Sequence, residues 1–188
     1  GFRAPNLSDL TRLDIARSGE FETPVSDLDP EKFLTGEIGI KAGGGWGMAQ
    51  LTAYWTDIED MIVRAPTGEK IAVGSTLYNE VTKKNAGDGH VAGIEWYQAL
   101  KLGRPWTWWL SASLMEGEIE NYPTSAAALE IEQISRLMPP TLVSGLRWRD
   151  AQDRLWTEAY VQAARKADRL SAADERDTER IPPGGTPG

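Results

Sequence analysis

The sequence is dominated by a period-two alternation of apolar and polar residues, a pattern that requires β-strands. The alternation is clearest over residues 34–41, where every second residue is small or apolar. Successive side chains of a strand point to opposite faces, so this spacing predicts a strand with one apolar and one polar face. The glycine-rich stretch at 42–47 predicts a tight turn. The alternation then continues in a second strand over residues 48–63.

The same alternation predicts four more strands. They cover residues 91–100, 106–115, 138–147 and 155–165. The connections alternate in length, with short turns at 42–47, 102–105 and 149–154 and long polar loops at 64–86, 116–137 and beyond 168. In an antiparallel meander, successive connections lie at opposite ends of the sheet, so all the short turns should share one end. This arrangement is typical of outer-membrane β-barrels, in which short periplasmic turns alternate with long extracellular loops.

The alternation also assigns a face to each strand residue. Strands of about 10 residues, rising about 3.3 Å per residue and tilted, would cross an apolar band of about 25 Å. We expect six apolar side chains to face lipid: Ile38, Ile40, Leu51, Ala53, Leu110 and Leu114. We expect five polar side chains to face the barrel lumen: Glu37, Gln50, Thr52, Glu95 and Ser111.

Tryptophans are frequent, with eight in 188 residues. Four of them lie within a few residues of a short turn: Trp46, Trp106, Trp148 and Trp156. Indole rings favour the membrane–water interface, so these four are predicted to form a membrane girdle. The alternative is that the tryptophans pack the core of a soluble protein.

Composition narrows the possible functions. The 28 Asp and Glu outnumber the 20 Lys and Arg, and the net charge of −8 argues against a nucleic-acid partner. The chain has no cysteine and a single histidine, His90, so thiolate chemistry, a catalytic triad and a multi-histidine zinc site are not expected. We therefore expect no enzyme activity, no catalytic or metal site and no cofactor.

Four groups could carry chemistry, and each has a simpler explanation. They are His90, the carboxylates Asp57, Glu59 and Asp60, the pair Glu37 and Glu95, and the glycine-rich stretch 43–47. His90 has no second ligand nearby, and the three carboxylates suit a solvated strand end as well as Ca²⁺. The glutamate pair could act as in a glycosidase, but alternation places both on a polar face. The glycines lack the following helix and Lys-Ser/Thr of a phosphate loop.

Several short motifs resemble those of TonB-dependent receptors. The opening segment resembles the family's "FRAP" segment through Phe2, Arg3, Ala4, Pro5, Asn6 and Leu7. Pro30 and Glu31 are similar to its "L-x-P-E" box, and Glu37, Gly39 and Lys41 to its "E-x-G-x-K" strand. Gly93 and Glu95 continue the family order, and the resemblance covers about residues 1–165.

The resemblance implies an all-β fold: about six antiparallel up-and-down strands of a 22-stranded transmembrane barrel with long extracellular loops. Residues 1–32 would be an extracellular loop, 33–168 the barrel strands and 169–188 a truncated loop. Both ends of the chain look cut, and the N-terminal plug that would contact the TonB complex is expected to lie outside it.

The resemblance further implies a receptor in the outer membrane of Gram-negative type, in contact with its lipid. It would import a scarce nutrient such as a ferric siderophore, cobalamin or haem. Haem is disfavoured because residues 6–30 contain no histidine, and 26–29 read Ser-Asp-Leu-Asp where the family has "NPNL". The alternative is a soluble β-sandwich that binds a ligand or carbohydrate through exposed tryptophans. Extraction from outer membranes only with detergent would separate the two.

Overall fold

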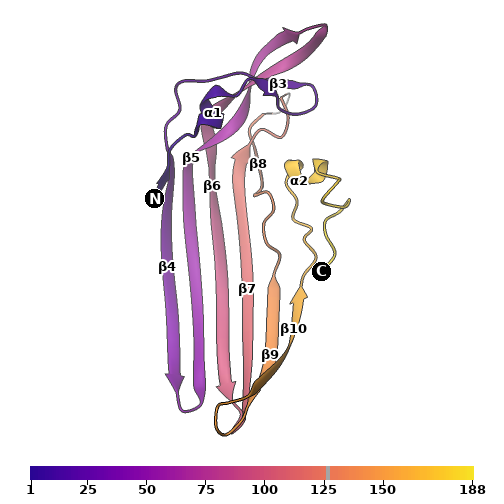
Figure 1. Ribbon diagram of the computed structural model, residues 1–188. Helices are drawn as coiled ribbons and strands as arrows, with labels where there is room; N and C mark the ends of the chain where they lie inside the picture. The colour runs from indigo at the N-terminus through magenta and orange to yellow at the C-terminus, as the bar shows by residue number, and fades with distance from the viewer. Residues whose placement is uncertain (126–127) are drawn as a thin grey trace.

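Six long strands form one antiparallel meander in the computed structural model, which describes residues 1–125 and 128–188 (Figure 1). They are β4 (Glu31–Gly44), β5 (Gly47–Val73), β6 (Thr76–Lys101), β7 (Trp106–Asn121), β9 (Thr141–Arg149) and β10 (Trp156–Ala164). Each pairs antiparallel with the next, which confirms the predicted all-β, up-and-down architecture. Within the described residues the sheet does not close on itself, as expected for part of a larger barrel.

Shorter elements surround one end of this sheet. They are β1 (Phe2–Arg3), α1 (Leu7–Thr11), β2 (Asp14–Ile15), β3 (Glu20–Glu22), β8 (Glu130–Gln133) and α2 (Ala172–Arg176). Capping boxes begin both helices, because the side chains of Asn6 and Ser171 accept hydrogen bonds from backbone N–H groups of the first turn. β3 lies parallel to β6, a contact that the alternation pattern did not predict. No helix among the described residues has the length and apolar character needed to cross a membrane.

Successive connections lie at opposite ends of the sheet, as predicted for an antiparallel meander. The turns β4–β5, β6–β7 and β9–β10 gather at one end of the sheet in Figure 1, here called the turn end. The N-terminal segment, the tip of the β5–β6 hairpin, β8 and α2 gather at the other end, here called the loop end.

The prediction of a loop over residues 64–86 is wrong, because most of this segment is strand. β5 runs on to Val73 and β6 starts at Thr76, so the hairpin projects beyond the rest of the sheet (Figure 1). The pairing shifts register between Pro66 and Lys70, and Gly68 there has φ of 86°. A bulge of this kind accommodates a proline inside a paired strand, which is why Pro66 and Gly68 did not end the hairpin.

The register confirms the predicted faces. Ile38 is opposite Ala53, and Ile40 is opposite Leu51, so these apolar residues share one face. The polar residues share the other, since Thr52 is opposite Glu95.

A small apolar core lies at the loop end. Six hydrophobic residues are buried there: Ile58, Ile62, Val63, Ala65, Val81 and Ile119. Residues 20–22 pair with β6 in this region. The chain therefore combines an open sheet toward the turn end with a packed core at the loop end.

Candidate functional site

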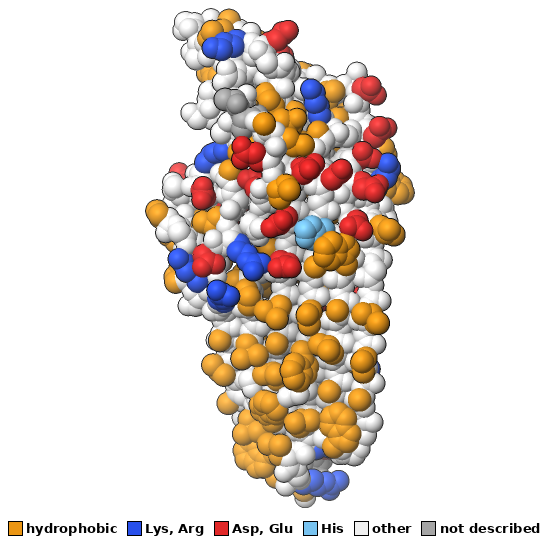
Figure 2. Space-filling view, turned by 180° about the vertical axis from the view of Figure 1, so that it is seen from behind, with side chains coloured by type: hydrophobic (Ala, Val, Ile, Leu, Met, Phe, Trp, Pro, Cys, Tyr) orange, Lys and Arg blue, Asp and Glu red, His pale blue; other side chains and the backbone are white. Residues whose placement is uncertain are grey.

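The first candidate site is the apolar face of the sheet, here called the outer face. Its exposed residues include Leu34, Ile38, Ile40, Leu51, Ile94, Trp96 and Leu114. Ile38 is 75% and Ile40 72% exposed, although large aliphatic side chains are usually buried in soluble proteins. Figure 2 shows many hydrophobic side chains over the part of the sheet toward the turn end, here called the apolar band, with most charged side chains gathered toward the loop end. An exposed apolar surface of this extent is characteristic of a surface that meets lipid or another protein.

Trp55 and His90 mark the border of this band on the loop side. Their rings stack at 4.5 Å between centroids with an interplanar angle of 4°. The Trp55 indole N–H donates to Asp57 at 2.7 Å, and Asp57 is paired with His90 across the strands. The four tryptophans singled out in the sequence did not include Trp55, because it lies far from any short turn.

The tryptophans near the turn end do not all share one face. Trp106 and Trp148 are cross-strand partners on the outer face, and Trp46 lies in the β4–β5 turn. Trp156 is paired with Arg149 on the opposite face, where the Arg147 guanidinium lies 5.5 Å from its ring centroid. Their common role as a membrane girdle stays a prediction.

The opposite, inner face carries the polar residues of the receptor-like motifs. Glu37, Gly39 and Lys41 alternate along β4 on this face, and Gly93 and Glu95 lie on it in β6. β5 separates Glu37 from Glu95, because Glu37 is opposite Tyr54 whereas Glu95 is opposite Thr52. The fold therefore does not bring the two glutamates together as cross-strand neighbours.

Two glycines on the inner face are covered by aromatic rings from the neighbouring strand. Tyr54 lies over Gly93, and a Cβ added at Gly93 would come within 2.4 Å of the Tyr54 ring carbon Cζ. Trp109 lies over Gly145 in the same way, at 2.6 Å. Glycine in a strand marks a close approach of this type, so these two positions fix where the rings lie on the inner wall.

We expect Gly93→Val to destabilise the complete protein by about 1–3 kcal/mol, because the new side chain overlaps the Tyr54 ring. Gly36→Val is the matched control, since a Cβ at Gly36 meets nothing within 4 Å. Urea unfolding of the complete protein in vesicles measures both. Adding Tyr54→Ala should recover most of the Gly93→Val loss, and equal losses for the two glycine variants would contradict the ring-over-glycine arrangement.

The "FRAP" and "L-x-P-E" motifs meet at the loop end through Arg3 and Glu31. β1 pairs with the start of β4, so Arg3 is opposite Glu31. The Arg3 guanidinium donates to both Glu31 oxygens, at 2.5 and 2.7 Å, and to Asp9 at 3.0 Å. Glu31 is 3% exposed and also accepts from the backbone N–H of Ile62 at 2.9 Å.

This contact changes the acidity of both groups, which lie beyond the apolar band. Burial by itself would raise the pKa of Glu31, but the hydrogen bonds from Arg3 and from the Ile62 N–H outweigh it and lower the pKa. The hydrogen bond to Glu31 is the main cause that raises the pKa of Arg3. The pair is therefore ionised and ties the N-terminal segment to the sheet.

The other residues of these two motifs lie in the N-terminal segment or directly before β4. Asn6 caps α1, while Phe2 and Leu7 are 77% and 74% exposed. Ala4 and Pro5 link β1 to α1, and Pro30 precedes β4.

Two of the carboxylates considered for Ca²⁺ bind other side chains of the protein. Asp60 pairs with Lys32 at 2.6 Å, and Asp57 accepts from Trp55. Among residues 1–125 and 128–188, no cluster of three or more His, Asp or Glu is arranged to hold a metal ion.

Sequence reasoning missed two buried acids of the N-terminal segment. Glu22 is 1% exposed and lies 2.8 Å from the Arg64 guanidinium. Glu20 is 4% exposed, pairs with Arg17 at 2.6 Å and accepts from the backbone N–H of Ser125. Polar residues in a segment with no periodicity give no sign of burial, so only the three-dimensional contacts identify them.

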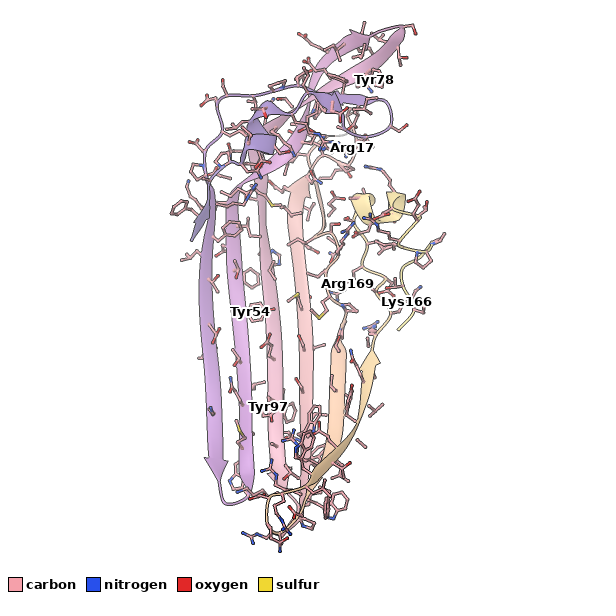
Figure 3. The ribbon with its side chains drawn as sticks, viewed as in Figure 1. Arg17, Tyr54, Tyr78, Tyr97, Lys166 and Arg169 are labelled. Atoms are coloured by element: carbon pink, nitrogen blue, oxygen red, sulfur yellow. The ribbon has the colours of Figure 1, made fainter. Side chains whose placement is uncertain are left out.

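Two cavities lie against the sheet, one near the middle of the strands and one at the loop end. The first, of about 500 Å³, lies between the middle of β5–β7 and residues 137–140 and 165–169. Tyr54, Lys166 and Arg169 line it and are labelled in Figure 3. The second, of about 560 Å³, lies among Arg17, Ile119 and the start of α2.

Comparison with known proteins matches the chain to a family. A family model described as "TonB dependent receptor-like, beta-barrel" matches residues 1–184. No curated protein sequence matched the chain. The solved structure of "Copper transporter OprC" has a TM-score of 0.63 at 14% identity, over 90% of this chain and 23% of that one. The siderophore receptor PirA from Pseudomonas aeruginosa has a TM-score of 0.51 at 18% identity, over 86% and 30%. The chain thus spans less than a third of either structure, and these two likenesses show the fold alone.

Proposed function

The chain belongs to the TonB-dependent receptor β-barrel family, and from this we propose that it forms consecutive barrel strands of an outer-membrane receptor that imports a scarce nutrient. The family is one of outer-membrane receptors and transporters, not of enzymes.

One observation carries the membrane assignment: a single sheet has an exposed apolar outer face and a polar inner face. Ile38 is 75% exposed on the outer face, while its neighbour Glu37 lies on the inner face beside Tyr54. Strands of transmembrane barrels alternate in this way between lipid and a polar lumen. A soluble β-sandwich would cover its apolar face with a second sheet, so this surface favours the receptor.

The proposed domain organisation follows from the two ends of the sheet. Residues 1–32 form a structured extracellular segment, 33–168 contain the barrel strands, and 169–188 belong to the next extracellular loop. The turn end then faces the periplasm of a Gram-negative cell. The Trp55–His90 stack supports a border of the lipid band at this level of the sheet, because aromatic rings favour membrane–water interfaces.

The ligand and the partner complete the proposal. We propose a small nutrient such as a ferric siderophore or cobalamin, and we add copper because one structural neighbour, OprC, is a copper transporter. Haem is less favoured, since residues 6–30 contain no histidine. The TonB complex would bind a region of the protein that is outside residues 1–188.

Thiol labelling on intact cells tests this topology. Residues 1–188 contain no cysteine, so every thiol labelled in this segment is an introduced one. A membrane-impermeant maleimide should label Ser18→Cys and Ser75→Cys in the complete receptor, because both residues are exposed at the loop end. It should not label Gly45→Cys, in the open β4–β5 turn, until the outer membrane is permeabilised.

Two results would count against the proposal. Labelling of Gly45→Cys on intact cells would show that the proposed topology is wrong. Release of the complete protein from membranes by salt alone, without detergent, would favour the soluble module.

A further inference from the structure

The second cavity, here called the cationic cavity, is rich in positive charge. Four cations line it, Arg17, Arg64, Lys83 and Arg176, together with one carboxylate, that of Glu132. They come from the N-terminal segment, β5, β6 and α2, so four separate parts of the chain bring positive charge to one place. Figure 3 shows Arg17 at the loop end, well away from Lys166 and Arg169 of the other cavity.

Neighbouring carboxylates offset part of this positive charge. Glu20 pairs with Arg17 at 2.6 Å. Glu22 is shared among Arg64 at 2.8 Å, Arg12 at 3.8 Å and Lys83 at 4.0 Å. Two further carboxylates lie close by: Asp174 accepts from the lining hydroxyls of Ser135 and Ser171, and the charge of Asp9 acts on Lys83. The side chains that line the cavity nevertheless include four cations and one carboxylate, although the whole chain has a net charge of −8.

Some buried polar atoms in and beside the cavity have no hydrogen-bond partner. Among the described residues, the buried Arg17 Nη2 has no hydrogen-bond partner, and the buried acceptors Glu22 Oε1 and Gln133 Oε1 also have none. Glu132 does not pair with the cations, because its two oxygens accept from the Asn121 side chain at 2.6 Å and from the backbone N–H of Ala172 at 2.9 Å. Buried donors are normally satisfied, so an unpartnered guanidinium nitrogen points to a missing acceptor.

The cavity wall strengthens electrostatic interactions. Ile62, Val63 and Ile119 are buried and line the same space. Apolar walls lower the local dielectric constant, so a charge placed there interacts more strongly with its neighbours than it would in water. Burial is the largest influence on Lys83 and lowers the pKa of its ammonium group, while the charge of Glu22 raises it and that of Arg64 lowers it again.

From this geometry we propose that the cationic cavity binds an anionic ligand through carboxylate or phosphate groups. Guanidinium groups recognise both in bidentate fashion, and Lys83 adds a point charge beside them. The inference rests on the proposed function in one respect: the anion is taken to be the acidic part of the imported nutrient.

Calorimetric titration of the purified complete receptor with citrate and with inorganic phosphate tests the proposal. We expect saturable binding of at least one of the two, weakened as salt is added. Lys83→Gln and Arg176→Gln should each raise its Kd about tenfold or more. Lys70→Gln and Arg154→Gln remove exposed cations outside the cavity and should leave the Kd within about twofold.

Proton uptake provides a readout that a purely structural role for Lys83 would not change. A bound anion should raise the lowered pKa of Lys83, so binding at alkaline pH should take up protons. Titrations in buffers of different ionisation enthalpy measure this uptake. We expect it in the wild type and expect it to be largely lost in Lys83→Gln.

Either of two outcomes overturns the proposal. One is the absence of saturable citrate and phosphate binding in the wild-type receptor. The other is binding that Lys83→Gln and Arg176→Gln leave unchanged, which would place the anion elsewhere. Both are distinguishable from failure of the proposed function, which the labelling of Gly45→Cys and the detergent requirement test without any ligand.

Discussion

Replacing Ile38 with arginine in the complete receptor is expected to destabilise the folded barrel by about 2–4 kcal/mol, the cost of a cation near the bilayer midplane. Ile38 lies at the centre of the alternating stretch 34–42 of β4 and is 75% exposed on the outer face. Its partner across the strands, Ala53, is too small to shield a charge. Reversible unfolding of the receptor in lipid vesicles measures the difference.

Glu37→Arg is the matched control for this prediction. Glu37 is adjacent in the sequence, so strand position and depth are nearly the same, but its side chain lies on the inner face. There an arginine can remain hydrated, and we expect a change within about 0.5 kcal/mol, as for ordinary surface substitutions. Equal losses for Ile38→Arg and Glu37→Arg would show that the outer face does not meet lipid.

Arg3→Ala is expected to cost about 3 kcal/mol, although the substitution lies far from the apolar band. Removing the guanidinium leaves the Glu31 carboxylate, 3% exposed, with the Ile62 N–H as its remaining hydrogen-bond donor among the described residues. An uncompensated buried charge of this kind is strongly destabilising. Urea unfolding of the complete receptor measures the loss.

Two comparisons separate this effect from a general sensitivity to arginine removal. Arg169→Ala breaks an exposed ion pair, in which the Arg169 side chain is 57% and the Glu116 side chain 62% exposed. This substitution should cost less than about 1 kcal/mol. Glu31→Gln should cost less than Arg3→Ala, because the 42% exposed Arg3 side chain can still reach water. If Arg3→Ala is no worse than Arg169→Ala, the contact does not hold the N-terminal segment.

The same pair predicts how stability depends on pH. The pKa of Glu31 is lower in the folded receptor than in the unfolded chain, so its contribution is fully present above the ordinary glutamate pKa of about 4.3. It is lost as the pH falls through the lowered folded value. Arg3→Ala should therefore flatten the acid side of the stability profile.

The sequence by itself determined the strands, their faces and the short turns. Each of these depends on local pattern: alternation fixes which side of the pleat a residue such as Ile38 occupies, and glycines fix the turn after β4. Because lipid replaces a protein core on the outer face, no long-range contact was needed to predict it. The short motifs between Phe2 and Glu95 also indicated the family, which a family model over residues 1–184 confirms.

Only the tertiary structure decided what happens at the loop end. Pro66 and Gly68 suggested a loop, but bulged pairing with β6 keeps the hairpin in register, and that pairing depends on the partner strand. Arg3 meets Glu31 across 28 residues, and the cationic cavity joins residues as distant as Arg17 and Arg176. Local periodicity carries no information about such contacts, since they arise when aperiodic segments fold back over the sheet and bury their charges together.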